Sequence, residues 1–160
     1  MQAPPQVKRL AYLTLVRLQL EYASAIWDPD TAYLSRKLES VQNRAARFIT
    51  NNYSPYASIS SLKKEIDLPD LGVRRKISRL SLFHKFFHSP SLRLSYIIPP
   101  HRISSSLDHQ FKVARFKCNS SSFLNSFFPK TSVEWNSLPP DTATIIETFQ
   151  FQNSLSSIIN

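Results

Sequence analysis

Carboxylates that could hold catalytic metal ions stand close together at two places in the chain. Asp28 and Asp30 form one pair, and Asp67 and Asp70 form the other. Polymerases and nucleases bind their metal ions through clustered carboxylates of this kind. Each pair here flanks a proline at a predicted helix boundary, where an aspartate commonly caps the next helix. We therefore interpret both pairs as helix caps and predict no catalytic residue.

A pair of histidines offers a second possible chemistry. His84 and His88 are four residues apart on a predicted helix, so both could contact one metal ion. No third ligand of suitable spacing stands near them, and His84 falls on the apolar face. We interpret His84 as a packed core histidine and predict no metal site. Cys118 has no evident histidine base, so we expect a packed or free thiol and no cofactor.

Several classes of protein are disfavoured by composition. The single cysteine excludes an internal disulfide framework and suits a reducing compartment. The single glycine, Gly72, removes glycine-rich phosphate loops and the serine-hydrolase elbow. Arg17 and Glu21 interrupt the N-terminal apolar run, so there is no clean signal peptide. We expect an intracellular protein, cytoplasmic or nuclear and not secreted, with no membrane partner and no small-molecule substrate.

An excess of positive charge is concentrated in the first half of the chain. The sequence holds 20 basic and 11 acidic residues, a net charge of +9, and residues 1–90 hold 14 basic and 7 acidic residues, or +7. This balance points to a polyanion such as the backbone of RNA or DNA. The candidate nucleic-acid-binding residues are arginines on two predicted helices: Arg44, Arg47, Arg74, Arg75 and Arg79. We expect them to face solvent and to form one positive strip if those helices pack side by side. The alternative is a set of ordinary solvated helix faces.

Apolar residues at spacings of three and four predict helices through most of residues 1–90. The first helix is predicted over 6–27, and only a narrow stripe through Arg17, Glu21, Ser24 and Asp28 is polar. A helix so widely apolar needs neighbours on several sides, which favours a protein partner. Further helices are predicted over the ranges 31–50, 56–66 and 71–88.

Serine and proline become frequent after Ser89, and the expected structure changes with them. Pro90, Pro99 and Pro100 are expected to break any helix, and Phe111–Phe116 is expected to be a short strand. Residues 129–140 are expected to be irregular around a buried Trp135, and an amphipathic helix is predicted over 143–158. The predicted face of that last helix holds Ile145, Ile146, Phe149, Leu155 and Ile158.

These elements predict a mainly α protein, a small bundle of three to four helices followed by an irregular extension and a C-terminal helix. We divide it into a basic helical domain, 1–90, and a Ser/Pro-rich extension, 91–160, which contains Trp135 and the terminal helix.

The sequence contains a series of short blocks in a characteristic order: Leu20–Ser24, Trp27–Pro29, Leu38–Phe48, Leu71 with Arg74–Arg75, Arg79–Phe83, Ser126–Lys130 and Glu134–Pro139. In this order they resemble the region that follows the polymerase domain in jockey-like non-LTR retrotransposon reverse transcriptases. The resemblance covers about residues 7–155, and its specificity lies in the order of the blocks. One departure is Leu18, where relatives usually have a proline after the pair that corresponds to Val16 and Arg17. Losing that proline should leave the first helix continuous.

The resemblance implies an origin in a retroelement polyprotein with an endonuclease and a reverse transcriptase upstream. The family's polymerase centre includes an aromatic-x-Asp-Asp motif, and this sequence has no adjacent Asp pair. The chain is therefore expected to be a non-catalytic segment, a truncated copy or fragment, that supports the RNA-directed DNA polymerase and contacts template RNA or target DNA. The alternative is a protein-interaction module that docks to the missing polymerase domain or to another partner.

Overall fold

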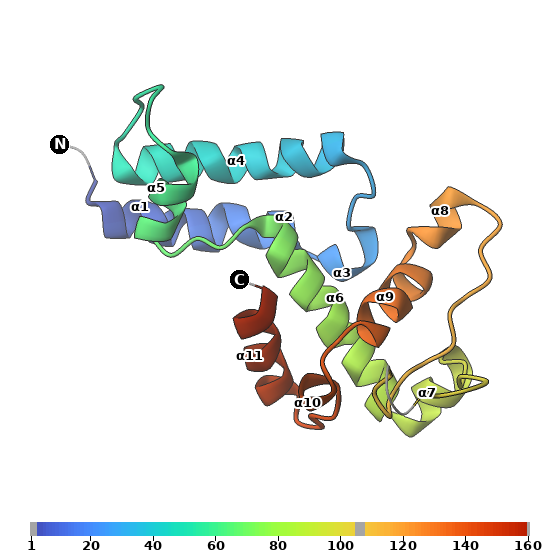
Figure 1. Cartoon of the computed structure of the whole chain (residues 1–160). Coiled ribbons are helices and arrows are strands. Elements are labelled where there is room, and N and C mark those ends of the chain that lie inside the picture. Colours follow the sequence, from blue (N-terminus) through green and yellow to red (C-terminus); the bar gives the residue numbers. More distant parts are fainter. Residues whose placement is uncertain (1–2, 105–107, 160) are drawn as a thin grey trace. The chain divides into compact units, whose positions relative to one another are not determined.

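The computed structural model describes residues 3–104 and 108–159. These residues form helices joined by loops and contain no β-strand, which confirms a mainly α fold with a C-terminal helix (Figure 1). The chain divides into two compact units. Unit 1 consists of Met1–Ser24 and Asp28–Arg75, and unit 2 of Ala25–Trp27 and Lys76–Asn160.

The predicted helix over 6–27 is in fact interrupted. α1 (Pro5–Ala11) continues through a π-helical stretch, η1 (Tyr12–Arg17), into α2 (Leu18–Glu21), so the chain is helical through Leu18 as expected. The helix then ends at Glu21, and a turn at Tyr22 and Ala23, in which Ala23 has a left-handed backbone conformation with a φ of 51°, precedes the short α3 (Ser24–Trp27). A left-handed conformation at a residue other than glycine costs about 1 kcal/mol. The sequence did not predict this break, because the apolar periodicity of the first helix continues across it.

Two helices of unit 1 agree with prediction. α4 (Ala32–Thr50) begins at Thr31, whose hydroxyl accepts a hydrogen bond from the backbone N–H of Leu34, and it ends at Asn51 with a φ of 54°. The predicted Asp-Pro start of this helix is wrong, because the threonine supplies the cap instead. α5 (Ile59–Glu65) is capped by Ser58 in the same manner.

α6 (Leu71–His88) has the predicted bounds, but the helix-breaking role given to Pro90 is wrong. Pro90 is the first residue of α7 (Pro90–Tyr96), a position where a helix needs no N–H donor. The strand predicted over Phe111–Phe116 is also wrong, because this segment is extended without pairing to another strand. Asn136 takes the place of a neighbouring strand: its amide donates to the Val113 carbonyl at 2.8 Å and accepts from the Val113 N–H at 2.9 Å.

The irregular structure predicted over 129–140 is largely helical. After α8 (Ser121–Leu124), α9 (Phe127–Asn136) carries Trp135, and α10 (Pro140–Ala143) follows. Pro129 lies in the first turn of α9, where proline is tolerated, so its presence did not exclude a helix. The last helix, α11 (Thr148–Ile159), starts five residues later than predicted and buries Phe151 and Leu155. The rest of its predicted face is mostly outside the core, since Ile146, Phe149 and Ile158 are exposed.

Each unit has its own apolar core. In unit 2, Trp135 lies with its ring centroid 5.2–5.8 Å from those of Phe83, Phe87 and Phe151, and it is fully buried as predicted. In unit 1, the fully buried apolar cluster is much smaller and consists of Tyr12, Ile49 and Leu68.

Candidate functional site

The five arginines proposed for nucleic-acid binding lie in very different environments. Arg44 is exposed on α4. Arg47 is half-buried and donates to the backbone carbonyl of Ser54 at 2.8 Å, which fixes the loop after α4. Arg44 is therefore the more open of the two to an incoming phosphate, whereas Arg47 has one of its N–H groups bound to the loop.

The three arginines of α6 are bound to carboxylates. Arg74 forms two hydrogen bonds with Glu21, and this pairing raises the pKa of Arg74. Arg75 is 3% exposed and its Nε donates to Asp28 at 2.7 Å. The expectation that these residues face solvent is therefore wrong for Arg75. It is also wrong for Arg79, which is described next.

Arg79 is 3% exposed and grips both oxygens of Glu134, with its Nη2 2.7 Å from each. Arg75 and Arg79 are four residues apart and follow the buried Leu71 on one face of the helix. Their acidic partners stand 47 and 55 residues away in sequence, so a local pattern could not reveal them. Both pairs are structural, because each guanidinium is buried and bound to a carboxylate, bidentately in the case of Arg79, and is closed to an incoming phosphate.

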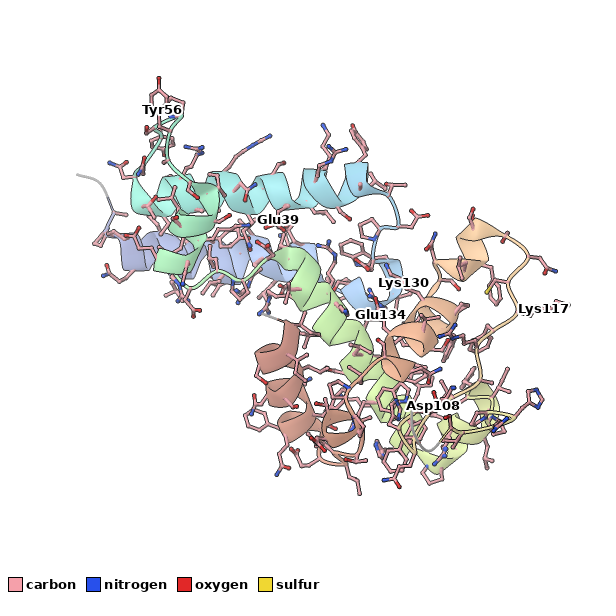
Figure 2. All side chains as sticks on the ribbon, viewed as in Figure 1. Glu39, Tyr56, Asp108, Lys117, Lys130 and Glu134 are labelled. Atoms are coloured by element: carbon pink, nitrogen blue, oxygen red, sulfur yellow. The ribbon has the colours of Figure 1, made fainter. Side chains whose placement is uncertain are left out.

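The expected strip across α4 and α6 also lacks the required packing. Within unit 1, α6 meets α4 at its first turn, where Glu39 of α4 accepts from the Leu71 N–H at 3.1 Å (Figure 2). Glu39 also binds Lys63 at 2.8 Å, and Lys63 in turn binds Asp70. This network holds the start of α6 to α5 and α4.

Three of the four paired aspartates act as counter-ions. Asp28 pairs with Arg75, and Asp70 with Lys63. Asp67 pairs with Arg9, which also donates to the Ile66 carbonyl at 2.7 Å.

Asp70 also stands directly before α6, where its carbonyl accepts from the Arg74 N–H at 3.1 Å, so the structure does not contradict its predicted capping position. Asp28 ends α3, and Thr31 rather than Asp30 caps α4.

His84 is packed in the core of unit 2, as predicted. It is 1% exposed, stacks on Phe151 at a centroid distance of 4.3 Å, and places its Nε2 2.8 Å from the Ile145 carbonyl oxygen. Burial lowers the pKa of both His84 and His88. Among residues 3–104 and 108–159, no group of three or more His, Cys, Asp or Glu side chains is arranged to bind a metal ion. Cys118 is half-buried and its thiol lies 3.4 Å from the Phe116 carbonyl oxygen.

An apolar groove lies between the first helix and α4, and sequence reasoning did not locate it. α1 packs along α4 in antiparallel fashion, with Lys8 beside Phe48 and the Tyr12 hydroxyl 2.9 Å from Gln42 (Figure 1). The groove between them has a volume of 360 Å³. Its lining consists of Lys8, Ala11, Tyr12, Leu15, Val16, Val41, Arg44, Ala45 and Phe48.

Large apolar side chains border this groove while remaining open to solvent. Leu15 is 67% exposed and Phe48 is 50% exposed. Tyr12 forms part of the floor, and burial raises the pKa of its hydroxyl to about 12. Contiguous exposed apolar surface on a soluble protein usually marks an interaction site. The signal in the sequence was the first helix's apolar character on most faces, which indicated a partner but not where it binds.

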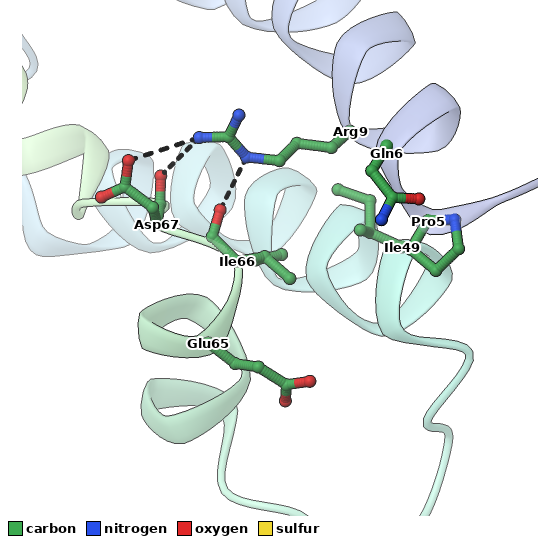
Figure 3. Close-up of a pocket in the computed structure, with 7 residues that line it drawn as sticks. All are labelled: Pro5, Gln6, Arg9, Ile49, Glu65, Ile66 and Asp67. Atoms are coloured by element: carbon green, nitrogen blue, oxygen red, sulfur yellow. Dashed lines mark hydrogen bonds and ion pairs between the residues drawn. The ribbon is translucent and has the colours of Figure 1, made fainter.

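A second hollow of unit 1 has a different character. It lies between α1 and the end of α5 and has a volume of 320 Å³ (Figure 3). Arg9 extends across it to the Ile66 carbonyl and to Asp67, and Glu65 also lines it. Because its cation is already bound to protein oxygens, this hollow offers no open cation to an anionic ligand.

No protein-family model, curated protein or solved structure matches the chain. Within the part of the chain that the structure describes, none of the helices combines the length and the apolar character needed to cross a membrane. The apolar groove between α1 and α4 is thus the candidate site that the geometry itself supplies.

Proposed function

We propose that this chain is a non-catalytic docking module from a retroelement. In this proposal it is the helical segment after the polymerase domain of a jockey-like non-LTR reverse transcriptase, and it supports that domain by binding it. The ordered blocks from Leu20–Ser24 to Glu134–Pro139 support the origin. The observation that carries the docking role is the groove between α1 and α4, with its exposed Leu15 and Phe48.

Docking to protein accounts for unit 1 better than binding to nucleic acid alone. Phosphate contact needs open cations, yet Arg74 and Arg75 are paired with Glu21 and Asp28. Covering an apolar groove with another protein, in contrast, is favourable by roughly 25 cal/mol for each Å² of apolar surface removed from water.

The origin and the docking role can be tested together. Sequencing the locus upstream of Met1 should reveal a reading frame, intact or decayed, with polymerase motifs. The polymerase domain encoded there is then co-expressed with the chain, and their complex is measured by size-exclusion chromatography. Leu15→Asp should abolish the complex, because it places a charge in the apolar groove.

The matched control is Leu18→Asp. Leu18 is 62% exposed and does not line the groove, so this variant should bind as the wild type does. A complex that survives Leu15→Asp would contradict docking at the groove, and an upstream sequence without any polymerase remnant would contradict the origin.

Contact with template RNA or target DNA is a second candidate, favoured by the exposed cations of α4. Arg36, Lys37 and Arg44 are exposed, while Glu39, the only acidic residue of this helix, is bound to Lys63. We expect weak binding that ignores sequence and weakens with salt, with a log–log slope of about −0.9 per phosphate on duplex DNA. The alanine variant of these three residues should reduce both affinity and slope. Binding that this variant leaves unchanged would contradict the role of α4.

A further inference from the structure

The groove of unit 1 is lined by two neighbouring helices in a pattern that suits a third helix packed against both. On the first helix it is lined at Lys8, Ala11 and Leu15, and on α4 at Val41, Ala45 and Phe48. Both sets follow the spacing of three and four residues by which a helix presents one face over two turns. Two antiparallel helices that leave such a channel between them accept the side-chain ridge of another helix.

The charges around this groove are all of one sign. Lys8 and Arg44 belong to the lining, and no acidic residue does. Lys8 is only 8% exposed, because its ammonium donates to the Phe48 carbonyl at 3.2 Å and lies 4.6 Å above the Phe48 ring, so this cation is largely covered. Arg44 is exposed on the α4 side. A well-matched occupant therefore carries negative charge beside its apolar contact surface.

A second copy of this chain is a poor match for that surface. Each copy carries a net charge of +9, so two copies would repel each other. Its terminal helix, α11, has exposed Phe149 and Ile158 but contains no acidic residue that could meet Lys8 or Arg44. Nucleic acid has the right charge, but its phosphates gain nothing from the apolar walls at Leu15 and Phe48.

We propose that the groove between α1 and α4 binds an acidic amphipathic helix of the partner protein. This proposal rests on the proposed function, because it takes the partner to be a protein that docks here. The apolar stripe of the bound helix lies against Tyr12, Leu15 and Phe48. Carboxylates that flank the stripe meet Arg44, which is exposed and can bind a carboxylate bidentately, while the covered ammonium of Lys8 adds positive charge beneath the apolar surface.

Synthetic peptides test this proposal on the full chain. The probe is a fluorescein-labelled helical peptide of about 20 residues with leucines at i, i+3, i+4 and i+7 and glutamates beside them. A matched peptide has lysines in place of the glutamates. Fluorescence anisotropy should show binding of the acidic peptide that weakens as salt rises, and no binding of the basic peptide.

Variants of the chain locate the site. Leu15→Asp should abolish binding of the acidic peptide, and Arg44→Glu should weaken it by about tenfold. Arg36→Glu is the matched control, because Arg36 is exposed on the same helix but does not line the groove, and it should change affinity little. Circular dichroism of each variant establishes that the fold is retained.

Several outcomes would overturn the acidic-helix proposal. These are no binding of the acidic peptide, equal binding of the basic one, or equal loss in Arg36→Glu and Arg44→Glu. Self-association that Leu15→Asp removes would assign the groove to a second copy instead. An RNA oligonucleotide that binds through Arg44 without regard to Leu15 and displaces the acidic peptide would assign it to nucleic acid.

The test separates this proposal from the docking function on which it rests. A polymerase-domain complex that is lost in Leu15→Asp but indifferent to Arg44→Glu and to salt would retain the docking function and refute the acidic helix. An acidic peptide that binds as expected, without any complex with the polymerase domain, would retain the acidic helix and refute the identity of that partner.

Discussion

Unit 1 and unit 2 are both helical, but unit 2 is built around aromatic rings whereas unit 1 is held largely by polar side chains. Trp135 and three phenylalanines form the centre of unit 2. In unit 1, the small cluster around Tyr12 and Ile49 is supplemented by ion pairs such as those of Lys63 with Glu39 and Asp70. In unit 1, where few apolar side chains are buried, these ion pairs help to fix the positions of the helices.

This difference explains where a partner is needed. Unit 2 buries four large aromatic side chains almost completely in one cluster, Phe83, Phe87, Trp135 and Phe151. Unit 1 leaves Leu15 and Phe48 open along a groove. Unit 2 is therefore expected to be the more stable part, and unit 1 the part that gains most stability from binding.

The largest expected effect is at the centre of unit 2. Trp135→Ala removes a fully buried indole that contacts three phenylalanine and two histidine rings and donates to the Phe111 carbonyl at 2.8 Å. We expect a loss of about 3–5 kcal/mol in the free energy of unfolding, measured with urea. Phe149→Ala is the control, since Phe149 is 67% exposed and its loss should matter little. An unchanged unfolding midpoint in the Trp135 variant would contradict the aromatic core.

Breaking the Arg79–Glu134 pair should have the next largest effect. Arg79→Ala leaves Glu134 largely buried without its counter-ion, which costs about 3 kcal/mol of unfolding free energy. Arg44→Ala, at an exposed arginine, should stay within about 0.5 kcal/mol of the wild type. Equal stability of the two variants would restore the view of Arg79 as a surface cation. Because Arg79→Ala is expected to lower the stability of the fold, weaker RNA binding by this variant could reflect unfolding. Its stability should therefore be measured beside its affinity.

A smaller effect is expected in unit 1, at the hydrogen bond between Tyr12 and Gln42. Tyr12→Phe keeps the ring but leaves the fully buried Gln42 without the hydroxyl 2.9 Å from its Oε1. The expected cost is about 1–3 kcal/mol, seen as a lower midpoint in thermal unfolding. Tyr33→Phe, at an exposed tyrosine of α4, supplies the control. If Tyr12→Phe unfolds like the wild type, polar contacts matter less in unit 1 than its small core suggests.

Acid should destabilise unit 2 through its histidines, and this is the smallest effect. Burial lowers the pKa of His84 and His88, so the unfolded chain binds more protons than the folded chain below the ordinary histidine pKa of about 6.5. Stability is therefore full above pH 6.5 and falls as pH drops toward the lowered folded-state values. Urea unfolding at several pH values measures this slope. His84→Phe, which can keep the stacking on Phe151, should reduce the slope, whereas an unaltered slope would exclude His84 as its source.

Sequence reasoning succeeded where the determining signals are local. The bounds of α4 and α6 follow from apolar periodicity and flanking turn residues, and the burial of Trp135 follows from its size. Pro90 was taken as a helix breaker and residues 129–140 as irregular, although Pro90 and Pro129 both lie in a first turn where proline fits. A proline's effect depends on its position within a helix, and the sequence leaves that position open when no clear cap precedes it.

The candidate site depended on information that is not local. Arg75 and Arg79 looked like surface cations because their partners, Asp28 and Glu134, are distant in sequence. The groove likewise arises only when α1 lies against α4, so no pattern within either helix could define it. The sequence did show that the first helix is apolar on most of its faces. This pattern predicted a partner outside the chain, but not the place where the partner binds.

The π-helical stretch η1 bears on how this chain can be aligned with relatives. In a π-turn each N–H bonds one residue further back than in an α-helix, so Tyr12–Arg17 accommodates an additional residue between α1 and α2. A relative that is one residue shorter here can form an ordinary α-helix and still direct the equivalent of Glu21 toward that of Arg74. A single-residue gap placed inside this stretch should therefore preserve the pairing on both sides of it. Homologues whose lengths vary by one residue at this point need not differ in fold.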